Sequence, residues 1–218
     1  MIILKLSVAI DGPAGAGKST IAKIVAKDLN LMYINTGSMY RAVTLKALEK
    51  SISAENVEEI CKLVETLEMH FENDELILNG ENVNSKLTMP EISKNVSAFA
   101  SIKEVRQILV KLQREMSTKY NVIMDGRDIG TVVLKDASYK FFLTASAEER
   151  ANRRFKELKE KGLDVNYEEI LKDIIDRDYK DTHRKVDPLV KASDAIEIDT
   201  TGLNINEVVK NIESYIKA

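Results

Sequence analysis

The sequence has little of what membrane proteins, secreted proteins and many metalloproteins are built from. Its single cysteine, Cys61, cannot form an intramolecular disulfide, which favours a reducing compartment. Its two histidines, His70 and His183, do not support a metal site made of histidines. The apolar run MIILKLSVAI at the start is too short to cross a bilayer and lacks the cleavage site of a signal peptide. We therefore expect a cytoplasmic protein with no membrane attachment.

The chain also lacks a large excess of charge of either sign. Lys and Arg total 32 against 35 Asp and Glu, a formal net charge of -3. Domains that bind nucleic acid are typically basic, so we expect no nucleic-acid partner and only a local site for an anion. The 218 residues are 44% hydrophobic, enough to bury one core without disulfides, and no repeat or flexible linker divides them.

Strand-like apolar runs alternate with helical patterns along most of the chain. The alternation predicts an α/β fold in which helices cover both faces of a parallel sheet. Ligands of such sheets bind beyond the carboxyl ends of the strands, here in the loops after Ile10, Ile34 and Met124. The runs are LKLSVAI (4–10), LMYI (31–34), NVIMD (121–125), YKFFLT (139–144) and DAIEI (194–198).

Two helix starts carry the pattern of a capping box, a serine followed three residues later by a glutamate. They are Ser101 with Glu104 and Ser146 with Glu149. In each we expect the serine side chain to accept a hydrogen bond from the backbone N–H of the glutamate.

The stretch from about residue 63 to 100 interrupts the alternation. It holds a short strand at 69–72, the hairpin turn signal Asn79-Gly80, and a helix start around Pro90. It has too few apolar residues for a core of its own. We interpret it as a lobe inserted into a single domain that spans residues 1–218.

The segment GPAGAGKS matches the phosphate-binding pattern G-x-x-x-x-G-K-[ST] at every fixed position, between a predicted strand and a helical pattern. Its glycines let backbone N–H groups converge on a phosphate, next to the positive end of the helix dipole. Lys18 would neutralise the β- and γ-phosphates, and Ser19 would bind Mg²⁺ with the nucleotide. A tight glycine turn without a ligand is the alternative. The expected nucleotide-binding residues are Gly12, Pro13, Ala14, Gly15, Ala16, Gly17, Lys18, Ser19 and Thr20.

A phosphate-binding loop does not specify what is done with the nucleotide. The sequence has no guanine-reading N-K-x-D segment, and a motor or transporter ATPase usually needs a larger chain. A small-molecule kinase needs only a second pocket and many arginines. The residues leave open the identity of the acceptor, and also a nucleotide-dependent binding module that shows no turnover.

Four segments together resemble the bacterial cytidylate kinases: IDGPAGAGKST, TGSMYR (36–41), DGRDIGTVV (125–133) and RDYKDTHRKVDPL (177–189). The resemblance runs in order from near residue 5 to near residue 210, and the last two segments are more specific than the first. It implies a P-loop kinase fold with a five-stranded parallel sheet, a monophosphate-binding lobe at about 63–100 and a mobile lid at about 148–165. It also implies transfer of a phosphoryl group from ATP to CMP or dCMP with Mg²⁺. We expect a monomer.

Several polar residues near predicted strand ends fit an acceptor-phosphate site. Arg41 lies near the start of a helix, and Arg127 and Asp128 follow the strand NVIMD. A surface arginine and a solvated turn are the alternatives. By the resemblance, Arg127 grips the acceptor phosphate, Asp128 reads the base, and Thr36 and Gly126 belong to the same site.

A cytosine base offers one amino donor and two acceptors, so a carboxylate, an arginine and a hydroxyl would match it. By the resemblance, these groups belong to Asp128, Arg106 and Ser97. On the residues alone, Arg106 reads as a surface charge on a helix, and Ser97 has no distinguishing feature.

The segment ERANRRFKELKEKG predicts an exposed helix with charge pairs four residues apart. Its first turns nevertheless gather Arg150, Arg153 and Arg154 where the family has its lid. A closing lid can bring arginines to the transferring group, and we choose Arg154 for this role.

The last motif contains Arg177, Asp181 and Arg184, whose spacing puts them on one face if the helix continues. Surface ion pairs would explain the same pattern. By the resemblance, Arg177 and Asp181 contact the acceptor sugar, and the two arginines neutralise phosphate charge. The expected catalytic residues are Lys18, Arg127, Arg154, Arg177 and Arg184.

Overall fold

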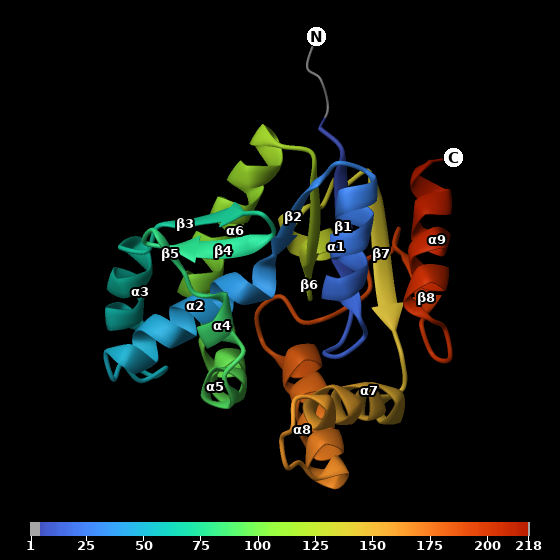
Figure 1. Cartoon of the computed structure of the whole chain (residues 1–218). Helices are drawn as coiled ribbons and strands as arrows, with labels where there is room; N and C mark the ends of the chain where they lie inside the picture. Colours follow the sequence, from blue (N-terminus) through green and yellow to red (C-terminus); the bar gives the residue numbers. More distant parts are fainter. Residues whose placement is uncertain (1–4, 218) are drawn as a thin grey trace.

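A computed structural model describes residues 5–217 of the chain. Its centre is a five-stranded sheet in the order β2-β6-β1-β7-β8, with every neighbouring pair parallel (Figure 1). The α/β fold with a parallel sheet is confirmed, and every predicted run contains a strand; residue 4 of the first run lies outside the described residues. The strands are β1 (Ser7–Asp11), β2 (Met32–Asn35), β6 (Val122–Gly126), β7 (Tyr139–Thr144) and β8 (Ile196–Asp199).

Helices cover both faces of this sheet, which is why its strands read as continuous apolar runs. Val8 and Ile10 pack with α1 (Lys18–Asp28) and α9 (Ile205–Ile216) on one face. Ala9, between them, packs with α2 (Thr36–Glu49) and α6 (Lys103–Lys119) on the other. The period of two along β1 thus feeds two separate apolar clusters.

The inserted stretch forms a small antiparallel sheet and helices beside α2 (Figure 1). Asn79 and Gly80 have φ of 49° and 80° and make the tight hairpin turn that the sequence predicts. Pro90 stands in the first turn of its helix, also as predicted. The buried residues here join the same apolar cluster as Ile34 and Met124 of the central sheet. The elements are α3 (Val57–Glu65), β3 (Met69–Glu72), β4 (Glu75–Leu78), β5 (Glu81–Asn82), α4 (Asn84–Leu87) and α5 (Pro90–Ala100).

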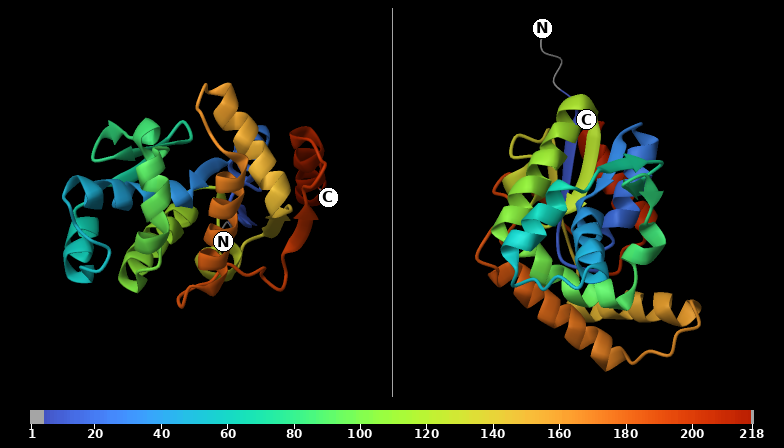
Figure 2. Two further views of the ribbon diagram at one scale, coloured as in Figure 1. Left: turned by 90° about the horizontal axis from the view of Figure 1, so that it is seen from below. Right: turned by 90° about the vertical axis from the view of Figure 1, so that its left-hand side faces the viewer.

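Two helices, α7 (Ala147–Glu160) and α8 (Tyr167–His183), lie below the carboxyl edge of the sheet in Figure 1. They pack on each other, and the left view in Figure 2, from below, shows α8 beside α5. Both helices bury few apolar residues. Their attachment therefore depends on polar contacts. Among residues 5–217, no helix is both long and apolar enough to cross a membrane.

The two predicted capping boxes turned out differently. Ser146 caps α7, since its side chain accepts from the N–H of Glu149 at 3.1 Å. The predicted capping box at Ser101 is wrong, because Ser101 ends α5 and its hydroxyl donates to the carbonyl of Ala98 at 2.7 Å. Helix α6 starts two residues later, after Ile102, without a side-chain cap.

Candidate active site

The phosphate-binding loop joins β1 to α1 and has a conformation that only glycine fits at its start. Gly12 has a φ of +145°, and a Cβ there would lie 2.0 Å from the carbonyl oxygen of Leu143. Gly17 is left-handed and precedes α1, whose start has no side-chain cap. The first N–H groups of α1 are thus available to a phosphate oxygen.

Lys18 opens α1 and is almost completely buried beside this loop. Its ammonium donates to the carbonyl of Pro13 at 2.6 Å. Burial lowers the pKa of Lys18 well below its ordinary value, and the positive charges of Arg127 and Arg177 lower it further. A buried cation close to other cations indicates a site for an anion such as a phosphate chain.

Ser19 faces a buried carboxylate that the sequence patterns did not single out. Its hydroxyl donates to Asp125 Oδ2 at 2.7 Å, and Tyr33 donates to the other oxygen at 2.9 Å. Burial raises the pKa of Asp125, against the opposing effect of Lys18. Within residues 5–217, no three His, Cys, Asp or Glu side chains gather as a metal site. A hydroxyl and one carboxylate nevertheless suit a divalent cation that takes its other oxygens from nucleotide phosphates and water.

Three partly buried arginines from different elements, Arg41, Arg127 and Arg177, come together near Lys18. Burial lowers the pKa of Arg41 on α2 and of Arg177 on α8 to about 10, and the charge of Arg127 contributes to both shifts. Asp181 is the carboxylate among them: Arg127 Nε donates to its Oδ2 at 2.8 Å, and Arg177 Nε lies 4.0 Å from the same oxygen. Positive charge therefore exceeds negative charge here, as an acceptor phosphate requires.

Arg41 also connects this arginine cluster to the inserted lobe. Its Nη1 donates to the carbonyl of Leu87 at 3.0 Å and to the hydroxyl of Ser93 at 2.9 Å. The surface-arginine alternative is therefore wrong for Arg41. Movement of the lobe would carry this guanidinium with it.

The predicted base-reading residues Asp128 and Arg106 are in direct contact. Asp128 follows β6, is 5% exposed and forms an ion pair with Arg106 Nη2. Arg106 is 1% exposed and donates through Nε to Asp187 at 2.8 Å, so the surface-charge alternative is wrong. Burial raises the pKa of Asp128, while Arg106 and Arg184 oppose that shift.

A cavity of about 390 Å³ lies between α5 and the end of α8. Ser97, Asp181 and Arg184 line it, so the structure brings together three residues that were predicted to bind the acceptor. Arg184 Nη2 lies 3.5 Å from Asp128 Oδ1 and has no hydrogen-bond partner among the described residues. Binding of an acceptor by Arg184 stays a prediction.

Two predicted acceptor residues contribute to the wall of the site through backbone packing. Thr36 is buried, and its hydroxyl donates to the carbonyl of Asp125 at 2.8 Å. A Cβ on Gly126 would lie 2.6 Å from that hydroxyl oxygen. The side chain of Thr36 is thus committed to the end of β6, and its contact with a substrate stays a prediction.

Arg150, Arg153 and Arg154 of α7 make three different kinds of contact, which the sequence did not distinguish. Arg154, chosen for the transferring phosphate, pairs with Glu157 of its own helix at 2.9 Å, although its charge also contributes to lowering the pKa of Arg41. Arg153 donates to the carbonyl of Thr200 at 2.7 Å. Arg150 is buried and holds α7 to the phosphate-binding loop.

Three contacts show how Arg150 makes this connection. It donates to the carbonyl of Ala14 at 2.9 Å, to the carbonyl of Ala145 at 3.0 Å and to Asp178 of α8 at 2.6 Å. One guanidinium thereby joins the phosphate-binding loop to α7 and α8. The role depends on contacts between distant segments, so the exposed-helix pattern concealed it.

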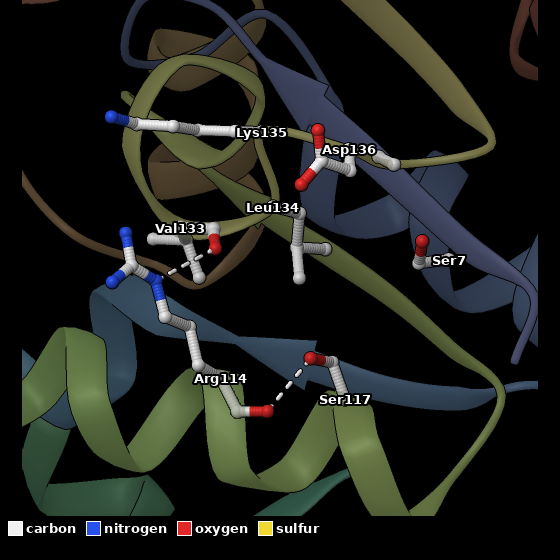
Figure 3. Close-up of a pocket in the computed structure, with 8 residues that line it drawn as sticks. Ser7, Arg114, Ser117, Val133, Leu134, Lys135 and Asp136 are labelled. Carbon is white, nitrogen blue, oxygen red and sulfur yellow. Dashed lines mark hydrogen bonds between the residues drawn. The ribbon is translucent and has the colours of Figure 1, made fainter. Parts of the chain in front are cut away.

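A second hollow, of about 290 Å³, lies at the opposite edge of the sheet near Ser7 (Figure 3). Arg114 there donates to the carbonyl oxygens of Val132 and Val133, as the close-up shows in part. Its guanidinium is thus used by the backbone. None of the predicted site residues lines this hollow.

A phosphate-binding loop and a cluster of arginines lie together at the carboxyl edge of a parallel sheet, and this arrangement is typical of a P-loop kinase. The chain belongs to the cytidylate kinase family, whose sequence model matches residues 8–218. It is 71% identical to the cytidylate kinase of Clostridium perfringens (strain SM101 / Type A) over 97% of this chain and 98% of that protein. It is 60% identical to the cytidylate kinase of Clostridium acetobutylicum over 98% of each.

A solved structure of an uncharacterized protein from Eubacterium ventriosum resembles this one with a TM-score of 0.54. The alignment covers 98% of both chains at 15% sequence identity. At that identity the likeness supports the fold alone.

Proposed function

We propose that the protein transfers the γ-phosphoryl group of ATP to CMP or dCMP and releases ADP with CDP or dCDP. The observation that carries this proposal is the closeness of the two anion sites. Asp11 pairs with Gly126 across β1 and β6, so the loop that starts at Gly12 lies next to Arg127, and the charges of Arg127 and Arg177 act on Lys18. A donor phosphate on the loop and an acceptor phosphate on the arginines would therefore meet. Membership of the cytidylate kinase family supports cytosine as the base of the acceptor.

Catalysis by this site rests on positioning and charge neutralisation. Lys18 binds the donor phosphates, while Arg41 and Arg127 hold the acceptor phosphate in line with them. Arg177 and Arg184 neutralise further phosphate charge. An oxygen of a phosphate monoester is already anionic near neutral pH, so no strong general base is needed.

Mg²⁺ is the divalent cation that we propose for the reaction. Ser19 would hold it through the hydroxyl oxygen, and the Asp125 carboxylate would orient that hydroxyl through their 2.7 Å contact. When bound with ATP, the ion neutralises charge on the phosphate oxygens.

We also propose that the protein works as a monomer in the cytoplasm. The large apolar side chains that are exposed within residues 5–217 are spread over many elements, for example Met89 before α5, Tyr120 after α6 and Tyr215 on α9. Isolated exposed apolar residues are normal on a monomer. Sedimentation velocity of the purified protein measures the oligomeric state directly.

The reaction is tested by measuring ADP release with ATP and a panel of acceptors. We expect turnover with CMP and dCMP, slower turnover with UMP, and no turnover with AMP, GMP or metabolite alcohols. ATP binding without any acceptor-dependent ADP release would contradict the proposal and favour a binding module.

Replacing Asp181 with alanine should raise the KM for CMP and dCMP more than it lowers kcat, because the side chain lines the acceptor cavity. The loss also frees Arg127 from its ion pair, so Asp181→Asn is the informative companion: it keeps an oxygen for Arg127 Nε. Asp173→Ala, on an exposed part of α8, is the matched control. Unchanged KM values for both acceptors would remove Asp181 from the binding site.

A further inference from the structure

Asp11, the last residue of β1, makes contacts that the reaction described above does not use. It is 4% exposed. Its Oδ1 accepts from the N–H of Ile129 and its Oδ2 from the N–H of Gly130, both at 2.7 Å. Since a carboxylate accepts through both oxygens, these two N–H groups are fully satisfied by one side chain.

The two N–H groups belong to the start of the short helical turn η1 (Ile129–Val133), which has a π-type geometry. Asp128 directly precedes this turn, and its carbonyl accepts from the N–H groups of Val132 and Val133 at 2.9 and 3.2 Å. Fixing the first two residues of η1 therefore fixes the backbone that carries the Asp128 side chain. Asp11, at the end of β1, thus caps the first two N–H groups of η1.

A second buried side chain lies beside Gly130 of η1. Lys140 is buried, and it donates to Asp194 at 2.7 Å. A Cβ on Gly130 would lie 3.1 Å from Lys140 Cδ and 3.4 Å from Asp11 Oδ2. A side chain at position 130 would therefore press on both Lys140 and Asp11.

This support matters because two arginines compete for Asp128. Arg106 pairs with one carboxylate oxygen, and Arg184 lies 3.5 Å from the other. A carboxylate on a loose turn would follow these charges, whereas one on a fixed turn keeps its orientation toward a bound base. Small displacements of such a group can change rates strongly.

We propose that Asp11 is a positioning residue for base recognition: it holds η1 so that the Asp128 carboxylate faces the acceptor base. The inference rests on the proposed function, in which Asp128 reads cytosine. Asp11 is adjacent to Gly12, where the phosphate-binding loop begins. The phosphate-binding loop and η1 are therefore both attached to the end of β1.

The test compares kcat/KM for CMP and UMP in the parent enzyme and in Asp11→Asn. The asparagine presents an amide N–H₂ to one of the two backbone donors, so it satisfies only one of them. We expect the ratio of kcat/KM for CMP over UMP to fall by about 10-fold, with little change in the KM for ATP. Hydrogen exchange should speed up at the amides of Ile129 and Gly130.

Three further variants keep the outcome interpretable. Gly130→Ala presses on both Lys140 and Asp11 and so disturbs the same turn while the Asp11 carboxylate is retained, and it should narrow the CMP-to-UMP ratio of kcat/KM as well. Asn121→Ala removes an exposed side-chain bond near the opposite end of β1, to the N–H of Leu6 at 2.9 Å, and should leave the CMP-to-UMP ratio of kcat/KM unchanged. Asp128→Asn reports whether Asp128 reads the base at all.

Three patterns of results would overturn the positioning role of Asp11. If Asp128→Asn narrows the ratio but Asp11→Asn and Gly130→Ala do not, the positioning role is overturned while the proposed function stands. A raised KM for ATP with an unchanged ratio assigns Asp11 to the donor loop and overturns the role too. If Asp128→Asn leaves the ratio unchanged, base reading by Asp128 fails, and the role of Asp11 in it fails as well.

Discussion

Replacing Lys18 with alanine is expected to lower kcat by about 10²-fold or more, with ATP as donor and CMP as acceptor. The ammonium is buried beside the phosphate-binding loop and close to the acceptor arginines. In the proposed reaction it acts where negative charge shifts during the transfer. Single-turnover kinetics with saturating ATP separate this loss of chemistry from weaker binding.

The same change should leave the fold intact. Burial lowers the pKa of Lys18 in the folded protein, so folding disfavours the charged form. That cost is fully present at every pH below the lowered pKa and disappears as the pH rises above the unfolded value. Near neutral pH, removing the ammonium relieves the cost, and the Tm of the ligand-free variant should not fall.

Lys27→Ala is the matched control, since it removes the same charge from an exposed position on the same helix. Its kcat should equal that of the parent. If Lys18→Ala also keeps turnover within a few-fold of the parent, the loop is not part of the catalytic machinery.

The features that the sequence predicted correctly are local ones. The phosphate-binding loop is a contiguous segment whose glycines impose its conformation, and the turn at Asn79 and Gly80 depends on two adjacent residues. The strands of the central sheet appear as apolar runs because both of their faces are buried. Such patterns can be read without knowing which segments meet.

The contacts of Asp125 and Asp11 could not be predicted from local sequence patterns. Each is a carboxylate at the end of a strand, and its role depends on the register that aligns β1 with β6. That register places Asp125 near Ser19, and Asp11 near the turn after β6. The only signal in the sequence was a carboxylate at each of two predicted strand ends.

The arginines illustrate the same limit for charged helices. Arg106 looked like a surface residue, but Asp128 and Asp187 bury and pair it from segments far along the chain. Arg150 and Arg154 lie one turn apart on α7, yet one anchors the lid and the other stays exposed. Spacing on a helix predicts which residues share a face, and only the packing decides which face is buried.

The Ser101 capping box failed because two helices compete for the same residues. Helix α5 continues to Ala100, so Ser101 completes its end and cannot also start α6. From the sequence alone, a serine at such a junction could equally well end the first helix or begin the second.

Replacing Asp128 with asparagine should narrow the ratio of kcat/KM for CMP over UMP. A carboxylate accepts from the amino group of cytosine but faces a carbonyl oxygen when the base is uracil. A hydrogen bond to a charged group contributes about 1.5 to 3 kcal/mol, which corresponds to roughly 10- to 150-fold in selectivity. The asparagine amide can rotate to donate or accept, so it loses much of this discrimination.

The fold should tolerate this change, because burial disfavours the Asp128 carboxylate and Arg106 retains its 2.8 Å bond to Asp187. Activity with CMP should fall, while activity with UMP falls less or improves. Asp173→Asn is the control: it removes a carboxylate from an exposed part of α8. We expect that control to keep the selectivity of the parent. An Asp128→Asn enzyme with an unchanged CMP-to-UMP ratio would mean that other residues read the base.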